Sequence, residues 1–124
     1  MFTEETLTSA LRAADAAASK KGERVVVLDM RDVTLIADYF VIVSAMNVIQ
    51  VESIAEAVQE ALQSQGLTRL NHSAKTSGHW VLLDYGSVVV HIFTEAERNY
   101  YDLERLWGDA RIVERQPLNK MPAH

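Results

Sequence analysis

The chain has 124 residues, 48% of them hydrophobic, and a formal net charge of −5 from 12 basic and 17 acidic side chains. This length fits one domain whose core needs no metal ion or disulfide, and the lack of cysteine excludes disulfides and thiolate metal sites. The acidic balance disfavours direct nucleic-acid binding and suits a basic protein partner or no charged partner. Without a signal-peptide pattern or roughly 20 consecutive apolar residues, we expect a cytoplasmic protein.

The first segment predicts a helix over residues 3–21. Thr3 can cap it, acidic residues occupy its first turn, and Gly22 ends it. One side carries apolar residues at helical spacing: Leu7, Ala10, Leu11, Ala14, Ala17 and Ala18. This side is rich in alanine, so a neighbouring element can approach closely.

Two strands and a second helix follow. Residues 25–30 and 39–45 are almost continuously apolar, which is typical of strands covered by helices. The helix begins at a capping box of Asn47 and Gln50 and ends at Gly66. Its apolar stripe again has helical spacing: Val51, Ile54, Ala55, Val58, Ala61 and Leu62.

The next part of the chain predicts a hairpin. Residues 79–84 and 87–93 resemble strands on either side of a short turn, so we expect antiparallel pairing. Residues 67–79 are polar and predict only a short strand over 67–70.

The last part predicts a helix that opens at Thr94 with Glu97 in its first turn. A short turn or helix over 102–107 and an edge strand at 112–113 follow. Helices thus alternate with strands around a hairpin, which predicts an α/β (α+β) fold with helices packed on a mixed β-sheet. We expect one domain over residues 1–113 and a loosely ordered tail over 114–124, where both prolines lie.

The sequence contains none of the common catalytic motifs. There is no GxxxxGK, GxGxxG or HExxH, and the histidines are scattered along the chain: His72, His79, His91 and His124. We therefore expect no metal site, no cofactor and no enzymatic activity.

A nucleotidyltransferase remains a candidate for a small mixed domain, because Gly86 and Ser87 form the Gly-Ser pair of such enzymes. That chemistry also needs an acidic pair to hold a divalent metal ion. An apolar strand follows Ser87 instead, which argues against this activity.

A hydrolytic triad of Ser87, His91 and Asp84 is a weaker candidate. Ser87 opens a strand, whereas a nucleophile elbow is a strand-to-helix turn within GxSxG. We instead interpret His91 as a half-buried histidine that is hydrogen-bonded within the sheet.

The hairpin carries the most informative side chains. Strand pleating places Trp80, Leu82 and Asp84 on one face and Tyr85 on the other. The first face is either an apolar interface patch with an acidic rim or core beneath a helix, with Asp84 bonded to the turn. Periodicity alone favours the core.

Several motifs resemble the ribosomal silencing factor (Iojap-like) family. They are HWVLLDYGSVVVHIF at 79–93, YDLERLWGD at 101–109, and ADYFVI at 37–42, followed in order by QV at 50–51 and IA at 54–55. The resemblance covers roughly residues 5–113. It implies a fold similar to nucleotidyltransferases but without their catalytic residues.

The resemblance also implies a function. Family members bind the large ribosomal subunit through ribosomal protein number fourteen, block joining of the small subunit, and lower translation when nutrients are scarce. It implies that Trp80, Leu82, Asp84 and Tyr85 belong to the partner-binding side. Further residues match a family signature to which we assign mainly packing: Asp102, Glu104, Leu106 and Trp107.

Three places depart from the family pattern. Ile49 replaces a common arginine, residues 71–74 lack the usual Glu-Gly, and Ser87 replaces an aspartate. These changes predict altered partner contacts or a structural cost. A nucleotide-using enzyme and a homodimeric adaptor that pairs through its apolar strand face remain the alternatives.

Overall fold

The computed structural model describes residues 2–67, 74–76, 78–101, 108 and 110–113. The elements are, in chain order, α1 (Phe2–Ser19), β1 (Glu23–Asp29), β2 (Tyr39–Ala45), α2 (Val48–Gln63), β3 (Ala74–Thr76), β4 (Trp80–Asp84), β5 (Val88–Thr94), α3 (Glu95–Tyr101) and β6 (Arg111–Ile112). The predicted α/β (α+β) class with a mixed sheet is confirmed. Of the strand expected over 67–70, only residue 67 is described, and it is not part of a strand. The turn or helix expected over 102–107 and the tail over 114–124 lie outside the described residues.

The six strands form one sheet in the order β3-β4-β5-β2-β1-β6. Only β2 and β5 pair in parallel, while the other neighbours are antiparallel. The predicted hairpin is confirmed, with Trp80 opposite Phe93 and Asp84 opposite Val89. The central strands β2 and β5 are buried along their whole length, which explains their nearly continuous apolar sequences.

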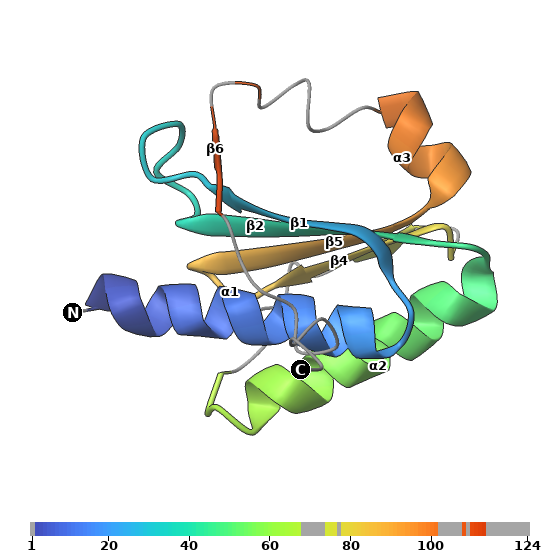
Figure 1. The fold of residues 1–124 in the computed structure, drawn as a ribbon, viewed down its shortest axis with the longest axis horizontal. Helices are drawn as coiled ribbons and strands as arrows, with labels where there is room; N and C mark the ends of the chain where they lie inside the picture. The colour runs from blue at the N-terminus through green and yellow to red at the C-terminus, as the bar shows by residue number, and fades with distance from the viewer. Residues whose placement is uncertain (1, 68–73, 77, 102–107, 109, 114–124) are drawn as a thin grey trace, which may run out of the picture.

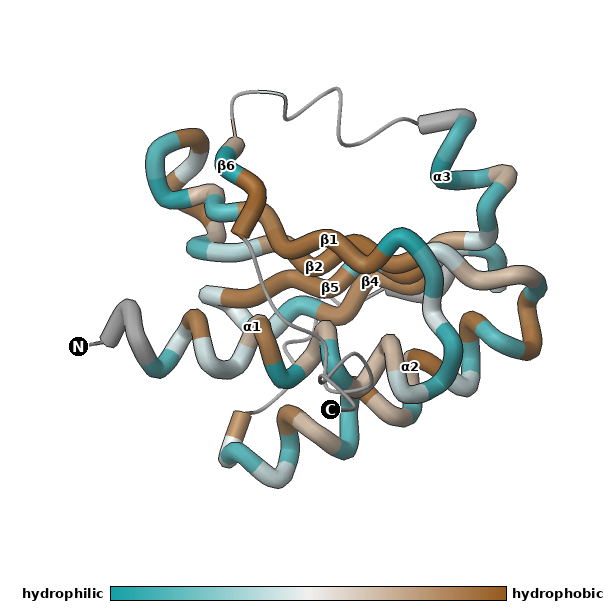
Figure 2. Tube along the Cα trace, viewed as in Figure 1, coloured by the Kyte–Doolittle hydropathy of each residue, from teal (hydrophilic) through white to brown (hydrophobic). Residues whose placement is uncertain are grey.

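Helices α1 and α2 lie side by side on one face of the sheet (Figure 1). The alanines on the inner side of α1 have no exposed surface, and α2 buries its predicted stripe except Ala61, which is half-buried. Together with the strand residues that face them, these side chains form the larger of two core clusters. In Figure 2 the apolar strands lie above the helices, whose more polar residues turn outward.

Gly22 follows the end of α1, as predicted. It does not itself adopt the left-handed conformation that often ends a helix. Lys21 takes that conformation, with a φ of 65°. The N–H of Gly22 donates to the carbonyl of Ala17 at 2.9 Å, and a Cβ on Gly22 would lie 2.7 Å from Cγ1 of Val43. A glycine is needed here because the turn passes close against β2.

The other face of the sheet carries the smaller core cluster. Its buried members are Leu28, Met30, Ala37, Phe40, Ile42, Val89 and Phe93. Helix α3 rises on this side of the sheet (Figure 1). None of the helices in the described part of the chain is long and apolar enough to cross a membrane.

Candidate partner-binding face

Strand β4 presents Trp80, Leu82 and Asp84 on one face of the sheet, and all three are half-buried. Trp80 and Leu82 pack against the smaller core cluster. Tyr85 has an exposed fraction of 8% and lies in the larger cluster, on the face that α1 and α2 cover. The structure therefore brings three of the four predicted residues together and places Tyr85 behind them. We call Trp80, Leu82 and Asp84 the β4 row.

Aromatic rings anchor one end of the β4 row. The ring centroids of Trp80 and Phe93 are 4.9 Å apart, and those of Phe40 and His91 are also 4.9 Å apart. His91 stacks on Phe93 with centroids 6.0 Å apart and an interplanar angle of 5°. Pairs at such distances are favourable beyond the area they bury. Trp80 is thus held in place while part of its surface remains accessible.

His91 differs from its predicted role. Its exposed fraction is only 6%, and neither ring nitrogen has a hydrogen-bond partner. The expectation of a half-buried, hydrogen-bonded histidine is therefore wrong. Burial lowers the pKa of His91 from 6.5 to about 4, although the charge of Asp84 acts in the opposite direction. The imidazole is consequently neutral near neutral pH and has no hydrogen bond to Ser87 or Asp84.

Asp84 stabilises the β4–β5 turn, as one of the two interpretations predicted. Its Oδ1 accepts a hydrogen bond from the N–H of Gly86 at 2.8 Å. The carbonyl of Ser87 accepts from the N–H groups of Asp38 and Tyr39 at 2.8 and 3.0 Å. The Gly-Ser pair thus joins the hairpin to the start of β2.

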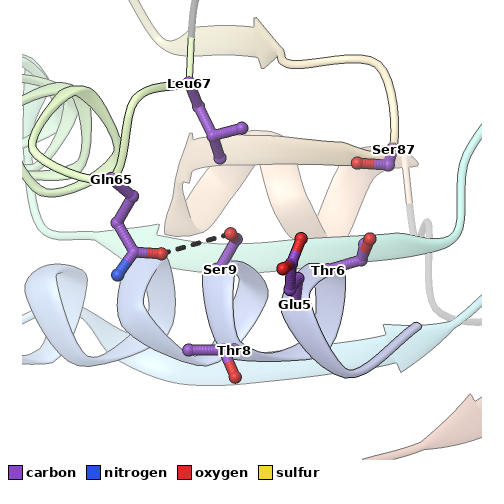
Figure 3. Close-up of a pocket in the computed structure, with 7 residues that line it drawn as sticks. All are labelled: Glu5, Thr6, Thr8, Ser9, Gln65, Leu67 and Ser87. Carbon is purple, nitrogen blue, oxygen red and sulfur yellow. Dashed lines mark hydrogen bonds between the residues drawn. The ribbon is translucent and has the colours of Figure 1, made fainter. Parts of the chain in front are cut away.

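A polar hollow lies on the helical side, between the start of α1, the end of α2 and the β4–β5 turn (Figure 3). The hydroxyl of Ser9 donates to Oε1 of Gln65 at 3.2 Å across it. Among the described residues that line it, Glu5 carries the only charge. Hydroxyl groups could donate to a phosphate there, but the carboxylate of Glu5 repels it and none of the described lining residues is a cation, so this hollow does not favour nucleotide binding.

Arg98 is a structural residue that the sequence did not reveal. It is buried and donates from Nη1 to the carbonyl of Arg24 at 2.6 Å and to Oγ of Ser44 at 2.8 Å. Arg24 in turn pairs with Glu95 at 2.6 Å. These contacts fasten α3 to β1 and β2. An arginine on a polar helix ordinarily faces water, so no sequence signal marked it.

Within the described residues, no group of three or more histidine, aspartate or glutamate side chains could hold a metal ion. The side chains of Asp102, Glu104, Leu106 and Trp107 lie outside that part of the chain.

Comparison with known proteins gives a consistent result. Residues 3–124 match the profile of a family described as "Ribosomal silencing factor during starvation". The Ribosomal silencing factor RsfS of Halalkalibacterium halodurans is 43% identical over 114 residues, which is 92% of this chain and 95% of that protein. That of Bacillus subtilis is 39% identical over 82% of this chain and 86% of its own.

Two crystal structures share the fold. One, from Bacillus halodurans, has a TM-score of 0.73 and 38% identity, and covers 90% of this chain and 99% of that one. The other, from Chromobacterium violaceum, has a TM-score of 0.76 and 32% identity, and covers 94% of this chain and 91% of that one.

Proposed function

Because the chain belongs to the ribosomal silencing factor family, we propose that it silences translation by binding the large ribosomal subunit and blocking its association with the small one. Ribosome-associated silencing is the role that the family's name states. The large subunit and its ribosomal protein number fourteen are the partners that the motif resemblance implies. In this proposal, the chain silences translation when nutrients are limited, and it does so in the bacterial cytoplasm.

The β4 row is the observation that carries this proposal. Trp80 and Leu82 are half-buried at the border of a packed aromatic layer. A partner could complete their burial without opening the core, and a rigid aromatic side chain of this kind is a typical interface anchor. Asp84 adds a carboxylate at the other end of the row.

The charge of the chain supports a protein partner. A net charge of −5 favours association with a basic ribosomal protein and disfavours direct contact with RNA phosphates. Electrostatic attraction of this kind mainly raises the association rate and makes it depend on salt. We assign Tyr85 a supporting role, because it packs against the reverse side of the strand that carries the row.

The mechanism we propose is steric. A folded domain fixed to the intersubunit side of the large subunit excludes the small subunit by its volume alone. No bond is made or broken, which agrees with a family named as a silencing factor and not as an enzyme.

Co-sedimentation with purified large subunits tests the proposal, and wild-type chain should pellet with them. We expect Trp80→Ala to weaken binding about tenfold or more, because it removes an interface anchor. Asp84→Lys should weaken binding and also reduce its dependence on salt. Circular dichroism checks that each variant is folded.

Wild-type chain that stays in the supernatant would contradict the function. If both variants are folded and bind normally, the β4 row is not the contact. A dimer that forms through this face would show as a mass that rises with concentration in light scattering, and Trp80→Ala should lower that mass.

A further inference from the structure

A group of exposed apolar side chains lies where β2 passes into α2. The exposed fraction is 75% for Met46, 81% for Ile49 and 39% for Val48. Val48 and Ile49 line a shallow hollow whose other described residues are Glu52, Ser53 and Glu56. We call these six residues the α2 surface.

The core does not explain this group. Helix α2 buries its regular stripe against the sheet and α1, while Val48, which continues that stripe by one turn, and Ile49 are exposed at its start. Single exposed apolar residues are common on proteins. A contiguous patch with a polar rim instead marks an interaction site.

The backbone beneath the α2 surface is held rigidly. Oδ1 of Asn47 accepts from the N–H of Gln50 at 2.9 Å, and Oε1 of Gln50 accepts from the N–H of Met46 at 2.6 Å. Nε2 of Gln50 donates to the carbonyls of Lys20 and Lys21 at 3.1 and 2.9 Å. The patch is therefore ordered before any partner arrives, which lowers the entropic cost of binding.

The charges around the hollow select the kind of partner. Glu52 and Glu56 follow Val48 at intervals of one helical turn, so the three lie along one side of α2. No basic residue is among the described residues that line the hollow. Lys20 and Lys21 contact Gln50 through their carbonyls and do not line it. Carboxylates repel RNA and anionic lipid but attract lysine and arginine.

The α2 surface lies close to the start of β4, although the β4 row faces the other side of the sheet. A Cβ on Gly78 would lie 3.1 Å from Cγ1 of Val48, and β4 begins two residues later at Trp80. The start of α2 and the start of β4 therefore meet at one end of the sheet (Figure 1). Because Trp80 faces away from α2, a partner that covers both Trp80 and Ile49 must extend around this end of the sheet.

We propose that the α2 surface is a second docking site, which receives a basic, amphipathic segment of a protein of the large ribosomal subunit. An apolar side chain of that segment fills the hollow over Val48 and Ile49, and a lysine or arginine pairs with Glu56. This inference rests on the proposed function.

Paired variants test the site by co-sedimentation with purified large subunits. Ile49→Asp places an acid in the first turn of α2, which the helix dipole favours, so the variant should fold. We expect it to bind about tenfold more weakly. Its control is Leu35→Asp, which changes a fully exposed residue in the β1–β2 loop at the opposite end of the sheet.

A second pair tests the charges. Glu56→Lys should weaken binding several-fold and reduce its salt dependence. Glu60→Lys makes the same change at an exposed position one turn further along α2 that does not line the hollow, and it should weaken binding less than Glu56→Lys does.

Cross-linking identifies what occupies the site. Because the chain has no cysteine, Ile49→Cys gives a single thiol for a photoactivatable cross-linker. On large subunits it should label a lysine- or arginine-rich protein segment. Labelling of RNA or of a second copy of this chain would overturn the proposal. The proposal would also be overturned if wild type pellets with large subunits and Ile49→Asp and Glu56→Lys bind as well as their control variants. If wild type itself does not pellet, the proposed function fails, and this site fails with it.

Discussion

Trp80 and His91 show how differently two side chains of one sheet face can act. Trp80 is half-buried and its ring packs on Phe93, so it can meet a partner at little cost in conformational entropy. His91 is buried among aromatic rings and has two ring nitrogens without hydrogen-bond partners. It therefore cannot take a proton without leaving a charge inside an apolar layer.

The buried histidine predicts a dependence of stability on pH. Burial lowers the pKa of His91 to about 4 in the folded chain, against 6.5 ordinarily. Above that ordinary value both states are neutral and His91 has no effect. As the pH falls from 6.5 towards 4, the unfolded chain takes up a proton that the folded chain does not, so the free energy of unfolding falls.

Urea unfolding of wild type and His91→Phe measures this effect. On going from about pH 7 to about pH 5, wild type should lose about 2 kcal/mol more than the variant. Between about pH 7 and about pH 8 the two should change equally, which provides the control. Equal losses at the lower pH would show that His91 is hydrated or charged in the folded protein.

At the scale of elements, the start of α2 depends on one side chain. The side-chain amide of Gln50 accepts from the N–H of Met46, just before the N-cap residue Asn47, and donates to two carbonyls that follow the end of α1. The two helices on one face of the sheet are thereby joined at their ends.

Removal of that amide should be costly. We expect Gln50→Ala to lower the free energy of unfolding by about 1–2 kcal/mol, because it leaves the N–H of Met46 and two carbonyls without these bonds. Gln63→Ala, at an exposed position of the same helix, should change it by less than about 0.5 kcal/mol. Equal effects in chemical unfolding would mean that water replaces the Gln50 bonds at no cost.

Sequence periodicity predicted most elements, because their residues agree with local rules. The bounds of β2 agree with the prediction, the hairpin is present, and Asn47 caps α2 as predicted, although the side chain of Gln50 bonds to Met46 and not to the N–H of Asn47. The short edge strand β3 was missed, since three residues within a polar stretch carry no periodic signal. The left-handed Lys21 and the buried Arg98 depend on contacts with distant strands, which local pattern cannot reveal.

The candidate site was predictable only in part. Pleating placed Trp80, Leu82 and Asp84 on one face, and the structure keeps them there. The sequence pattern did not reveal that this face holds a second packed cluster, or that His91 lies within that cluster without hydrogen bonds. The exposed start of α2 was also unmarked, because Val48 and Ile49 look like ordinary apolar residues of a helix.

At the scale of the whole molecule, the sheet separates two sides with different roles. Helices α1 and α2 cover one face and supply most of the core, while the other face carries the aromatic layer and the β4 row. In the proposed function, this acidic domain binds a basic ribosomal protein and acts by its volume alone.

An assay of subunit joining tests the steric mechanism most directly. Purified large subunits are saturated with the chain, small subunits are added, and joined ribosomes are quantified by light scattering and on sucrose gradients. We predict that joining falls in proportion to the occupied large subunits, and that Trp80→Ala restores it at the same concentration. Normal joining of large subunits that demonstrably carry the chain would contradict the steric mechanism.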